Sequence, residues 1–171
     1  MNYIKINPTD IANGTGVRVT LFVSGCRNHC EGCFQPETWD FNYGKHYTEH
    51  TKTRIIQLLS YNYISGLTLL GGEPFEEENQ KELSKLVTEV KTIYSEKTIW
   101  VYTGYLIEEL VNHKIKYTPY IDNFLLHIDV VVDGKFILNQ KDISLEFRGS
   151  RNQRIIDVQY YLSNHQIATL F

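Results

Sequence analysis

The alternation of short β-rich runs with longer helical runs constrains the fold of this chain more than any other feature. Runs rich in β-branched and aromatic side chains predict four strands, at residues 17–23, 66–70, 98–103 and 128–132. Apolar residues at helical spacing predict helices at residues 49–61, 76–94 and 108–112. The order strand, helix, strand is typical of right-handed βαβ units around a parallel sheet. We therefore predict an α/β fold with a mainly parallel sheet.

The size and composition limit this fold to one domain. Four or five βα units are fewer than the eight of a closed barrel, so we expect a partial, open (β/α) barrel in residues 1–171. A hydrophobic content of 42% suits a soluble globular core, and no apolar run approaches the roughly 18 residues that a membrane span needs. The formal charge of -3 offers no electrostatic reason to bind nucleic acid or an acidic membrane.

All the cysteines of the chain lie in one short segment, with C-x3-C-x2-C spacing at Cys26, Cys30 and Cys33. Three thiolates on one loop can hold three irons of a four-iron four-sulfur cluster. Electron-carrying clusters are usually closed by four cysteines, so here a substrate, a solvent molecule or another protein must complete the coordination. The open iron that results is a site for chemistry.

Two other uses of these cysteines stay open. Zinc could take the three thiolates with His29, although His29 directly precedes Cys30 and adjacent side chains rarely converge on one ion. A disulfide with one free thiol is the other alternative. The chain begins at Met1 without an apolar signal segment, so we expect a reducing, cytoplasmic setting that disfavours a disulfide.

Four candidate loops follow the four predicted strands. Besides the cysteine loop, they are the segments 71–74, 103–105 and 133–135. Ligands of parallel α/β sheets gather at the carboxyl ends of the strands, so these loops should form one mouth. The paired glycines Gly71 and Gly72 would let backbone carbonyls approach a bound ammonium, while Pro74 starts the next helix. The alternative is a tight strand-to-helix turn without a ligand.

These motifs resemble known families. The cysteine loop, the aromatic Phe34 that follows it and Gly71-Gly72-Glu73-Pro74 resemble the radical S-adenosylmethionine enzymes. Further segments are similar to the activating subunits of the anaerobic, class III ribonucleotide reductases: residues 13–16, 21–26, 100–105, 132–136 and 148–154. This resemblance extends from about residue 2 to about residue 157, and so leaves out the tail at 158–171.

The resemblance implies a reaction. The open iron of the cluster would bind the amino and carboxylate groups of S-adenosylmethionine, and one electron would release methionine and a 5′-deoxyadenosyl radical. That radical would abstract hydrogen from a glycine of the large reductase subunit, which is the implied partner. The implied electron donor is a flavodoxin-like protein.

The resemblance also implies roles for individual residues. Cys26, Cys30 and Cys33 would ligate the cluster. Gly32, Cys33 and Phe34 would line the S-adenosylmethionine pocket, with Phe34 near the adenine, where the family more often has Tyr or Trp. Gly71, Gly72 and Glu73 would meet the methionine ammonium, and close relatives often carry Asp in place of Glu73. Thr103 and Asp133 are further candidates for this pocket.

Several of these segments also have structural interpretations that the sequence does not exclude. Thr103 and Tyr105 face the ligand or cap a strand, and Asp133-Gly134 forms part of the site or a two-residue hairpin turn. Arg148, Arg151 and Arg154 dock the reductase or form surface ion pairs. The acidic run 76–78 favours the start of a helix through the helix dipole. The tail at 158–171 packs on the open sheet edge or contacts a partner.

Three functions are consistent with these features. The first is activation of the anaerobic ribonucleotide reductase through a glycyl radical. The second is activation of another glycyl radical enzyme, such as pyruvate formate-lyase, whose activators are longer and lack the stretch 147–153 in this form. The third is a zinc-binding interaction module without catalysis.

Overall fold

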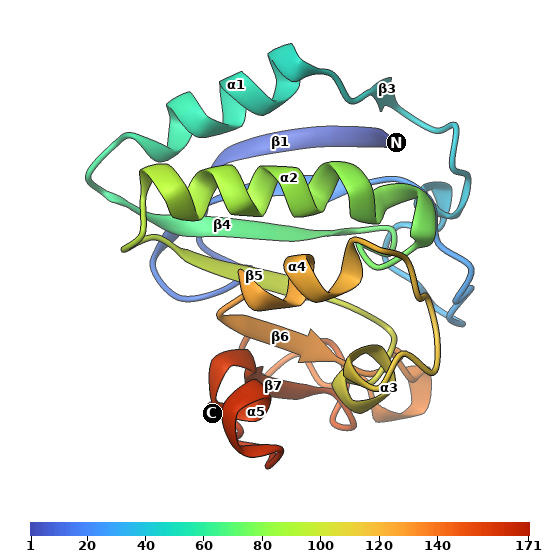
Figure 1. Cartoon of the computed structure of the whole chain (residues 1–171). Coiled ribbons are helices and arrows are strands. Elements are labelled where there is room, and N and C mark those ends of the chain that lie inside the picture. The colour runs from blue at the N-terminus through green and yellow to red at the C-terminus, as the bar shows by residue number, and fades with distance from the viewer.

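The chain folds around a single seven-stranded sheet, seen in a computed structural model that describes all 171 residues (Figure 1). The strand order is β3-β1-β2-β4-β5-β6-β7, and the sheet is open, with β3 and β7 at its edges. The strands are β1 (Asn2–Asp10), β2 (Val17–Val23), β3 (Lys45–His46), β4 (Ile64–Gly71), β5 (Thr98–Tyr102), β6 (Val130–Asp133) and β7 (Arg154–Asp157).

The four central strands run parallel and the outer ones antiparallel. β2 pairs with β4, β4 with β5 and β5 with β6 in parallel, whereas β1 and β3 on one side and β7 on the other pair antiparallel. The predicted parallel sheet is therefore confirmed for its centre. The antiparallel edges have no clear sequence pattern, because β1 mixes polar and apolar residues, and β3 and β7 are very short.

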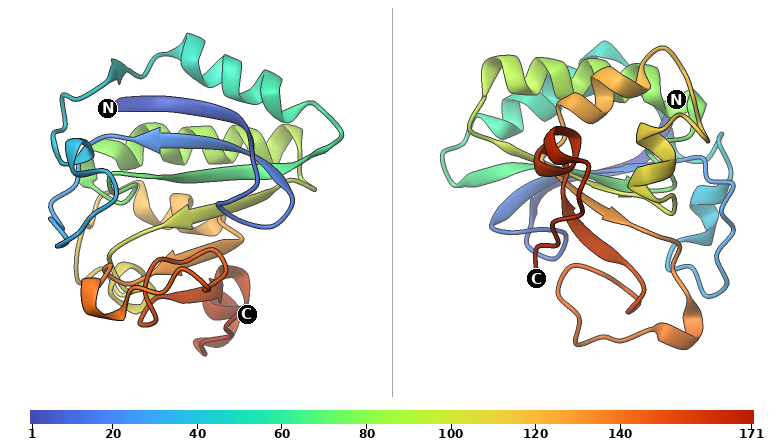
Figure 2. Two further views of the ribbon diagram at one scale, coloured as in Figure 1. Left: turned by 180° about the vertical axis from the view of Figure 1, so that it is seen from behind. Right: turned by 60° about the horizontal axis from the view of Figure 1, so that its bottom comes forward.

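The long helices cover one face of the sheet. Figure 1 shows α1 (Glu49–Leu59), α2 (Glu77–Ile93) and α4 (Ile121–Leu126) on the near face, and α3 (Ile107–Val111) and α5 (Val158–Asn164) beside the last strands. Short 3-10 turns lie at Pro36–Trp39 and Leu138–Gln140. The connection between β6 and β7, residues 134–153, lies on the opposite side of the sheet from these helices (Figure 2). We call it the β6–β7 segment.

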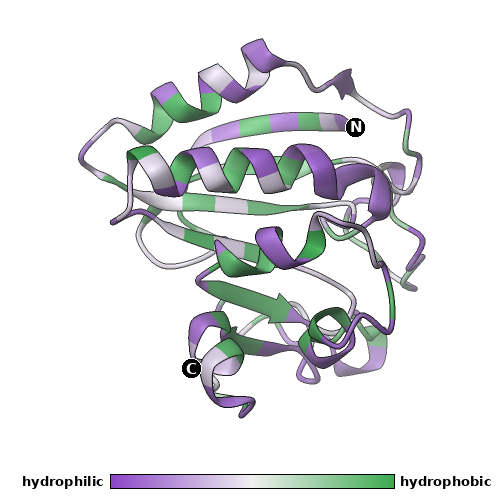
Figure 3. Cartoon of the chain, in the orientation of Figure 1, coloured by the Kyte–Doolittle hydropathy of each residue, from purple (hydrophilic) through white to green (hydrophobic).

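The main core fills the space between the sheet and the helices. Leu83, Leu86, Val87 and Val90 recur at helical spacing on α2 and are buried, which explains why the predicted helix forms where it does. In Figure 3 the central strands are largely hydrophobic, β6 almost throughout. A smaller cluster on the other face is formed by Trp100, Val130, Val132 and Ile155, and the partly buried Tyr102, Phe147 and Leu170 pack against it.

A buried arginine holds the turn before β2 against the sheet. Arg18 is fully buried and donates five hydrogen bonds, to Thr15 O, Leu67 O, Thr98 O and the hydroxyls of Thr68 and Thr98. Gly14 has a φ of +124°, and a Cβ there would lie 2.8 Å from the Arg18 side chain. Gly14 of the motif at 13–16 is therefore required by the packing of this arginine.

The tail covers the open edge of the sheet. The Leu170 N–H donates to Ile155 O at 2.8 Å, and Thr169 forms an antiparallel bridge with Ile156 of β7. The ring of Phe171 lies 5.7 Å from that of Phe147, edge to face. Of the two possibilities for this tail, the structure shows packing on the sheet edge. No helix in the chain combines the length and the apolar character that a membrane crossing requires.

Candidate functional site

One cavity of about 620 Å³ opens at the carboxyl ends of the parallel strands and continues along the sheet face opposite the helices. At one end it is lined by Cys26, Asn28, Cys30, Cys33, Phe34, Gly71, Gly72, Glu73, Thr103 and Gly104. The wall facing the sheet comes from the β6–β7 segment, including Phe136, Leu145, Phe147, Arg148 and Gly149. Loops after β2, β4 and β5 and the β6–β7 segment thus meet in one cavity.

Backbone hydrogen bonds join the cysteine loop to the glycine turn. The Gly72 N–H donates to Val23 O at 2.8 Å, and the Glu73 N–H donates to Gly25 O at 2.8 Å. A Cβ at Gly72 would lie 2.6 Å from Gly25 O, closer than any side chain allows. Glycine is therefore required here by the approach of two loops, a reason that does not involve a ligand.

The three cysteines are free and differ in burial. Cys26 is buried, while Cys30 and Cys33 are partly exposed. Burial, and then the nearby Glu73 carboxylate, raise the pKa of the Cys26 thiol to about 11, and burial also raises the pKa of Cys30. No three Cys, His, Asp or Glu side chains of the chain are grouped closely enough to hold a metal ion. The donor set suits a cluster, but ligation requires the sulfurs to converge further and to lose their protons.

Glu73 joins three loops. One carboxylate oxygen accepts from the Phe75 N–H at 3.0 Å; the other accepts from the Gly104 N–H at 2.8 Å and from the Asn28 amide at 3.1 Å. The side chain is buried, and this burial raises the pKa of Glu73 to about 7. Both oxygens of the predicted ammonium-binding carboxylate therefore already hold the cysteine loop, the glycine turn and the loop after β5 together.

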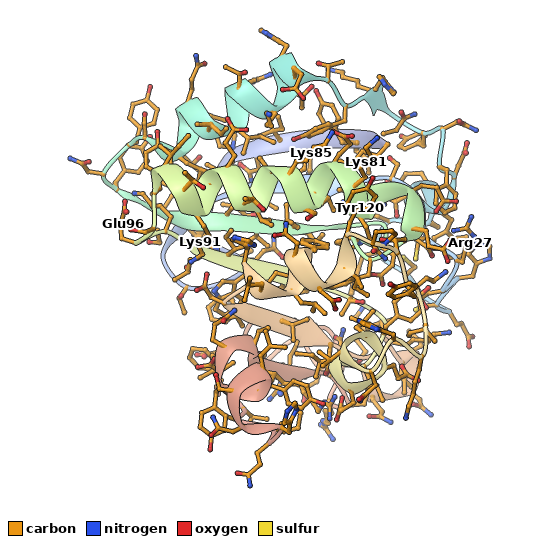
Figure 4. The ribbon with its side chains drawn as sticks, in the orientation of Figure 1. Arg27, Lys81, Lys85, Lys91, Glu96 and Tyr120 are labelled. Atoms are coloured by element: carbon orange, nitrogen blue, oxygen red, sulfur yellow. The ribbon has the colours of Figure 1, made fainter.

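Glu76 and Glu78 clamp the cysteine loop to the start of α2. The buried Glu76 carboxylate accepts from the Arg27 N–H at 2.9 Å and from its guanidinium at 2.6 Å, and pairs with Lys116 at 2.8 Å. Glu78 pairs with the other end of the same guanidinium. Arg27 lies at the end of the molecule where α2 begins (Figure 4). We predicted only a dipole effect for this acidic run, but Glu76 acts chiefly through these ion pairs.

Other predicted pocket residues lie in different surroundings. Phe34 lines the cavity, is 66% exposed and packs against Phe136 with ring centres 5.2 Å apart. Thr103 lines the cavity, and its hydroxyl oxygen also accepts from the Tyr105 N–H at 3.1 Å. Thr103 therefore both faces the cavity and caps its strand. Gly32 adopts a φ of +71° beside Leu138 and is not part of the cavity lining.

Asp133 is held by an arginine. Its carboxylate accepts two hydrogen bonds from Arg154, at 2.9 and 2.5 Å, and one from the Ile107 N–H at 2.9 Å. Asp133 is fully buried and does not line the cavity, whereas Gly134 does. The alternative of a hairpin turn at Asp133-Gly134 is wrong, because β6 pairs with β7 some twenty residues later.

His29 is not placed to act as the fourth zinc ligand. The His29 ring stacks on Trp39, with ring centres 4.6 Å apart and an interplanar angle of 21°. His29 is exposed, has a φ of +46° and is absent from the cavity lining. A fourth ligand for a tetrahedral site is therefore not placed beside the three thiols.

The three arginines of the segment 148–154 have three different surroundings. Arg154 is bound to Asp133 and Glu108, and the exposed Arg151 pairs with Asp142. Arg148 lines the cavity, and its Nη1 donates to Gln153 O at 3.1 Å. The Gln153 side chain accepts from the Gly149 and Ser150 N–H groups and donates to Gly134 O, which fixes this turn.

Sequence reasoning missed three residues of the site: Asn28, Gly104 and Arg148 as a cavity residue. A Cβ at Gly104 would lie 2.4 Å from the Asn28 amide, so the two positions are coupled. Each stands in or next to a segment that the sequence singled out, namely the cysteine loop, 103–105 and 148–154. Their position in these segments is the only sequence signal for a role in the site, because contacts such as the one between Asn28 and Gly104 join residues that are distant in sequence.

Comparison with known proteins identifies the family. A model described as a 4Fe-4S single cluster domain matches residues 12–156. The chain is 42% identical over 155 residues to the anaerobic ribonucleoside-triphosphate reductase-activating protein of Enterobacteria phage T4, covering 91% of this chain and 93% of that protein. The protein of the same name from Vibrio cholerae serotype O1 is 44% identical, over 91% of this chain and 97% of its own length. The one from Escherichia coli (strain K12) is 41% identical, over 90% of this chain and 96% of its own length. The chain therefore belongs to the family of anaerobic ribonucleoside-triphosphate reductase-activating proteins and contains a 4Fe-4S single cluster domain.

Proposed function

We propose that this protein activates the anaerobic ribonucleotide reductase by generating a glycyl radical on its large subunit, with S-adenosylmethionine as the radical source. One observation carries the proposal. All three thiols of the chain, the Gly71-Gly72-Glu73 turn and Thr103 line one cavity at the carboxyl ends of parallel strands. The family to which the chain belongs, named for activation of this reductase, supports the same target.

Cys26, Cys30 and Cys33 would hold a 4Fe-4S cluster, leaving one iron without a protein ligand. When bound, such a cluster supplies the single electron that splits S-adenosylmethionine into methionine and a 5′-deoxyadenosyl radical. The chain itself would orient the ligand. Phe34 offers an aromatic face, and the backbone of Gly71 and Gly72 approaches the cavity without side chains.

The rest of the site positions these groups. Glu73, bound to Asn28 and Gly104, would keep the cysteine loop and the glycine turn at a fixed separation, and it would face the ammonium of the ligand from the cavity wall. Thr103 would contact the ligand from the third loop, and Gly32 would let the loop turn between Cys30 and Cys33. Asp133 would act through Arg154 and the start of α3, since it does not line the cavity.

The proposal extends to the architecture and the partners. Residues 1–171 would form one radical S-adenosylmethionine domain, whose open sheet with four parallel central strands is compatible with a partial (β/α) barrel. The electron would come from a flavodoxin-like donor in the cytoplasm. Activation of pyruvate formate-lyase is less favoured, because the named relatives act on the anaerobic ribonucleotide reductase.

Anaerobic reconstitution with iron and sulfide tests the cofactor. We expect a brown protein with charge-transfer absorption and about four irons per chain, and replacement of Cys30 by Ala should abolish both. A colourless protein that holds one zinc would contradict the proposal and favour a zinc-binding interaction module. The matched control is Ser24→Ala, which changes a buried residue of the same segment that has no thiol.

A second experiment tests the target. The reduced, cluster-loaded protein is mixed with S-adenosylmethionine and the reductase subunit, and electron paramagnetic resonance should show a glycyl radical doublet. The same mixture with pyruvate formate-lyase should show none. A doublet only in the second mixture would identify the other activator class.

A further inference from the structure

Two residues that line the cavity each carry a buried polar atom that has no hydrogen-bond partner within the chain. The two atoms are the Tyr102 hydroxyl oxygen on β5 and Arg148 Nε on the β6–β7 segment. An unmade hydrogen bond on a buried polar group is destabilising, more so on a charged one, and native proteins rarely retain such groups without a function. Two of them in one cavity indicate a ligand with hydrogen-bond acceptors.

Three side-chain amides of the cavity already have partners within the chain. Asn13 donates to Asp10, Asn28 donates to Glu73, and Gln153 donates to Gly134 O. Arg148 uses one N–H, on Nη1, for Gln153 O. Among the residues that line this cavity, only Arg148 and Tyr102 carry a buried polar atom that has no partner.

Both groups lie by the small apolar cluster on the sheet face opposite the helices. Tyr102 packs against this cluster, and so does Phe147, the neighbour of Arg148, whose ring meets Trp100 at 5.5 Å. This part of the cavity runs between the sheet and the β6–β7 segment, which Figure 2 shows on the side away from the helices. The segment also exposes Ile143 by 94% at the cavity rim.

We infer that Arg148 and Tyr102 receive the main-chain carbonyl oxygens of the partner segment that carries the target glycine. This inference rests on the proposed function, because hydrogen abstraction requires that glycine to enter the cavity. A polypeptide that enters brings carbonyl groups, and away from water each needs a donor. An extended segment alternates its carbonyl directions, so donors on two facing walls suit it.

If Arg148 and Tyr102 bind the partner segment, the two ends of the cavity have different functions. The cysteine end holds the cofactors, and the end between the sheet and the β6–β7 segment holds the polypeptide. Arg148 lies next to a turn that is held by hydrogen bonds from the Gly149 and Ser150 N–H groups to the Gln153 side chain. The segment at 148–154 therefore positions one arginine for the partner, and Arg154 fixes the base of the segment at Asp133.

The test compares Arg148→Gln and Tyr102→Phe with the wild type, all loaded anaerobically with the cluster. Two quantities are measured with the purified reductase subunit: its dissociation constant, and the glycyl radicals formed per 5′-deoxyadenosine released. We expect Arg148→Gln to weaken binding and lower the radical yield about 10- to 100-fold, as for a lost hydrogen bond from a charged group. Tyr102→Phe should raise the dissociation constant and lower the radical yield about 3- to 10-fold.

The controls separate this role from a structural one. Arg151→Gln changes an exposed arginine three residues along the same segment and should behave as the wild type. Tyr102→Phe removes only an oxygen without a partner, so its fold and iron content should be intact even if Arg148→Gln loses stability. The affinity for S-adenosylmethionine alone is measured in parallel for every variant.

Three results would overturn the inference. Wild-type binding and coupling in both variants would show that the two groups do not contact the partner. A fall in S-adenosylmethionine affinity equal to the fall in reductase affinity would assign Arg148 to the nucleotide pocket. A wild type that releases no 5′-deoxyadenosine would overturn the proposed function itself and this inference with it.

Discussion

The Glu76 carboxylate lies 2.6 Å from the Arg27 guanidinium, and none of the Glu76 side chain is exposed. The two residues are forty-nine positions apart. Arg27 directly follows the first cysteine, and Glu76 precedes α2, so this pair fixes the cysteine loop to the helix that supports the glycine turn. The site is thus held by ion pairs and buried carboxylates behind the residues that would meet ligands.

Replacement of Glu76 by Gln should release that loop. We expect the free energy of unfolding to fall by about 2–3 kcal/mol, less than for a fully buried pair because Arg27 is half exposed. Iron retained after reconstitution should fall as well. Urea unfolding and iron analysis measure the two effects. Glu77→Gln, at an exposed and unpaired neighbour, is the control, and equal behaviour of the two variants would contradict the clamp.

Replacement of Gly72 by Ala should separate the two loops. Its methyl would lie 2.6 Å from Gly25 O, a backbone atom, so the loops themselves must move. Gly104→Ala is the milder matched variant, because its methyl meets the Asn28 side chain, which can turn away. We expect a loss of about 2–3 kcal/mol for Gly72 and about 1 kcal/mol for Gly104 in urea unfolding. The reverse order would show that the backbone contact is unimportant.

Glu73 should make stability depend on pH. Its pKa in the folded chain is raised by burial to about 7 from 4.5, so the folded chain binds this proton more tightly than the unfolded chain. The stability that this carboxyl contributes is present below pH 4.5 and is lost as the pH rises through about 7. The loss is at most about 3.5 kcal/mol, at about 1.4 kcal/mol per pKa unit.

Urea unfolding from pH 5 to 8 measures this effect. Glu73→Gln carries no titrating group, so its stability should fall less over that range than the stability of the wild type. Parallel pH profiles of the two proteins would show that Glu73 keeps an ordinary pKa.

Replacement of Asp133 by Asn tests whether this residue has a structural role or contacts the ligand. Because its carboxylate is buried against Arg154 and the Ile107 N–H, Asp133→Asn should lower the free energy of unfolding by about 2–3 kcal/mol. The affinity of the reconstituted variant for S-adenosylmethionine should stay within about threefold. Asp122→Asn, at an exposed contact with His113 Nε2, should change stability by less than about 1 kcal/mol. A large loss of affinity with intact stability would restore the direct ligand contact that the sequence suggested.

The sequence by itself determined the central strands, the long helices and the positions of the loops that follow them. These features are local: β2 is rich in β-branched and aromatic residues, α2 repeats its apolar residues at helical spacing, and the cysteine spacing fits within one loop. Parallel strands place their carboxyl ends at the same edge, so the meeting of Cys26, Gly72 and Thr103 in one cavity also follows from local patterns.

Only the tertiary structure decided which side chains hold the site and which remain free. Glu73, Glu76 and Asp133 each read in the sequence as one acidic residue near a turn, yet their partners lie in other loops. Arg148 and Arg154 belong to one motif, but one lines the cavity and the other is bound to Asp133. Hydrogen bonds and ion pairs act over a few ångströms in space, and the sequence does not record which distant groups folding brings that close.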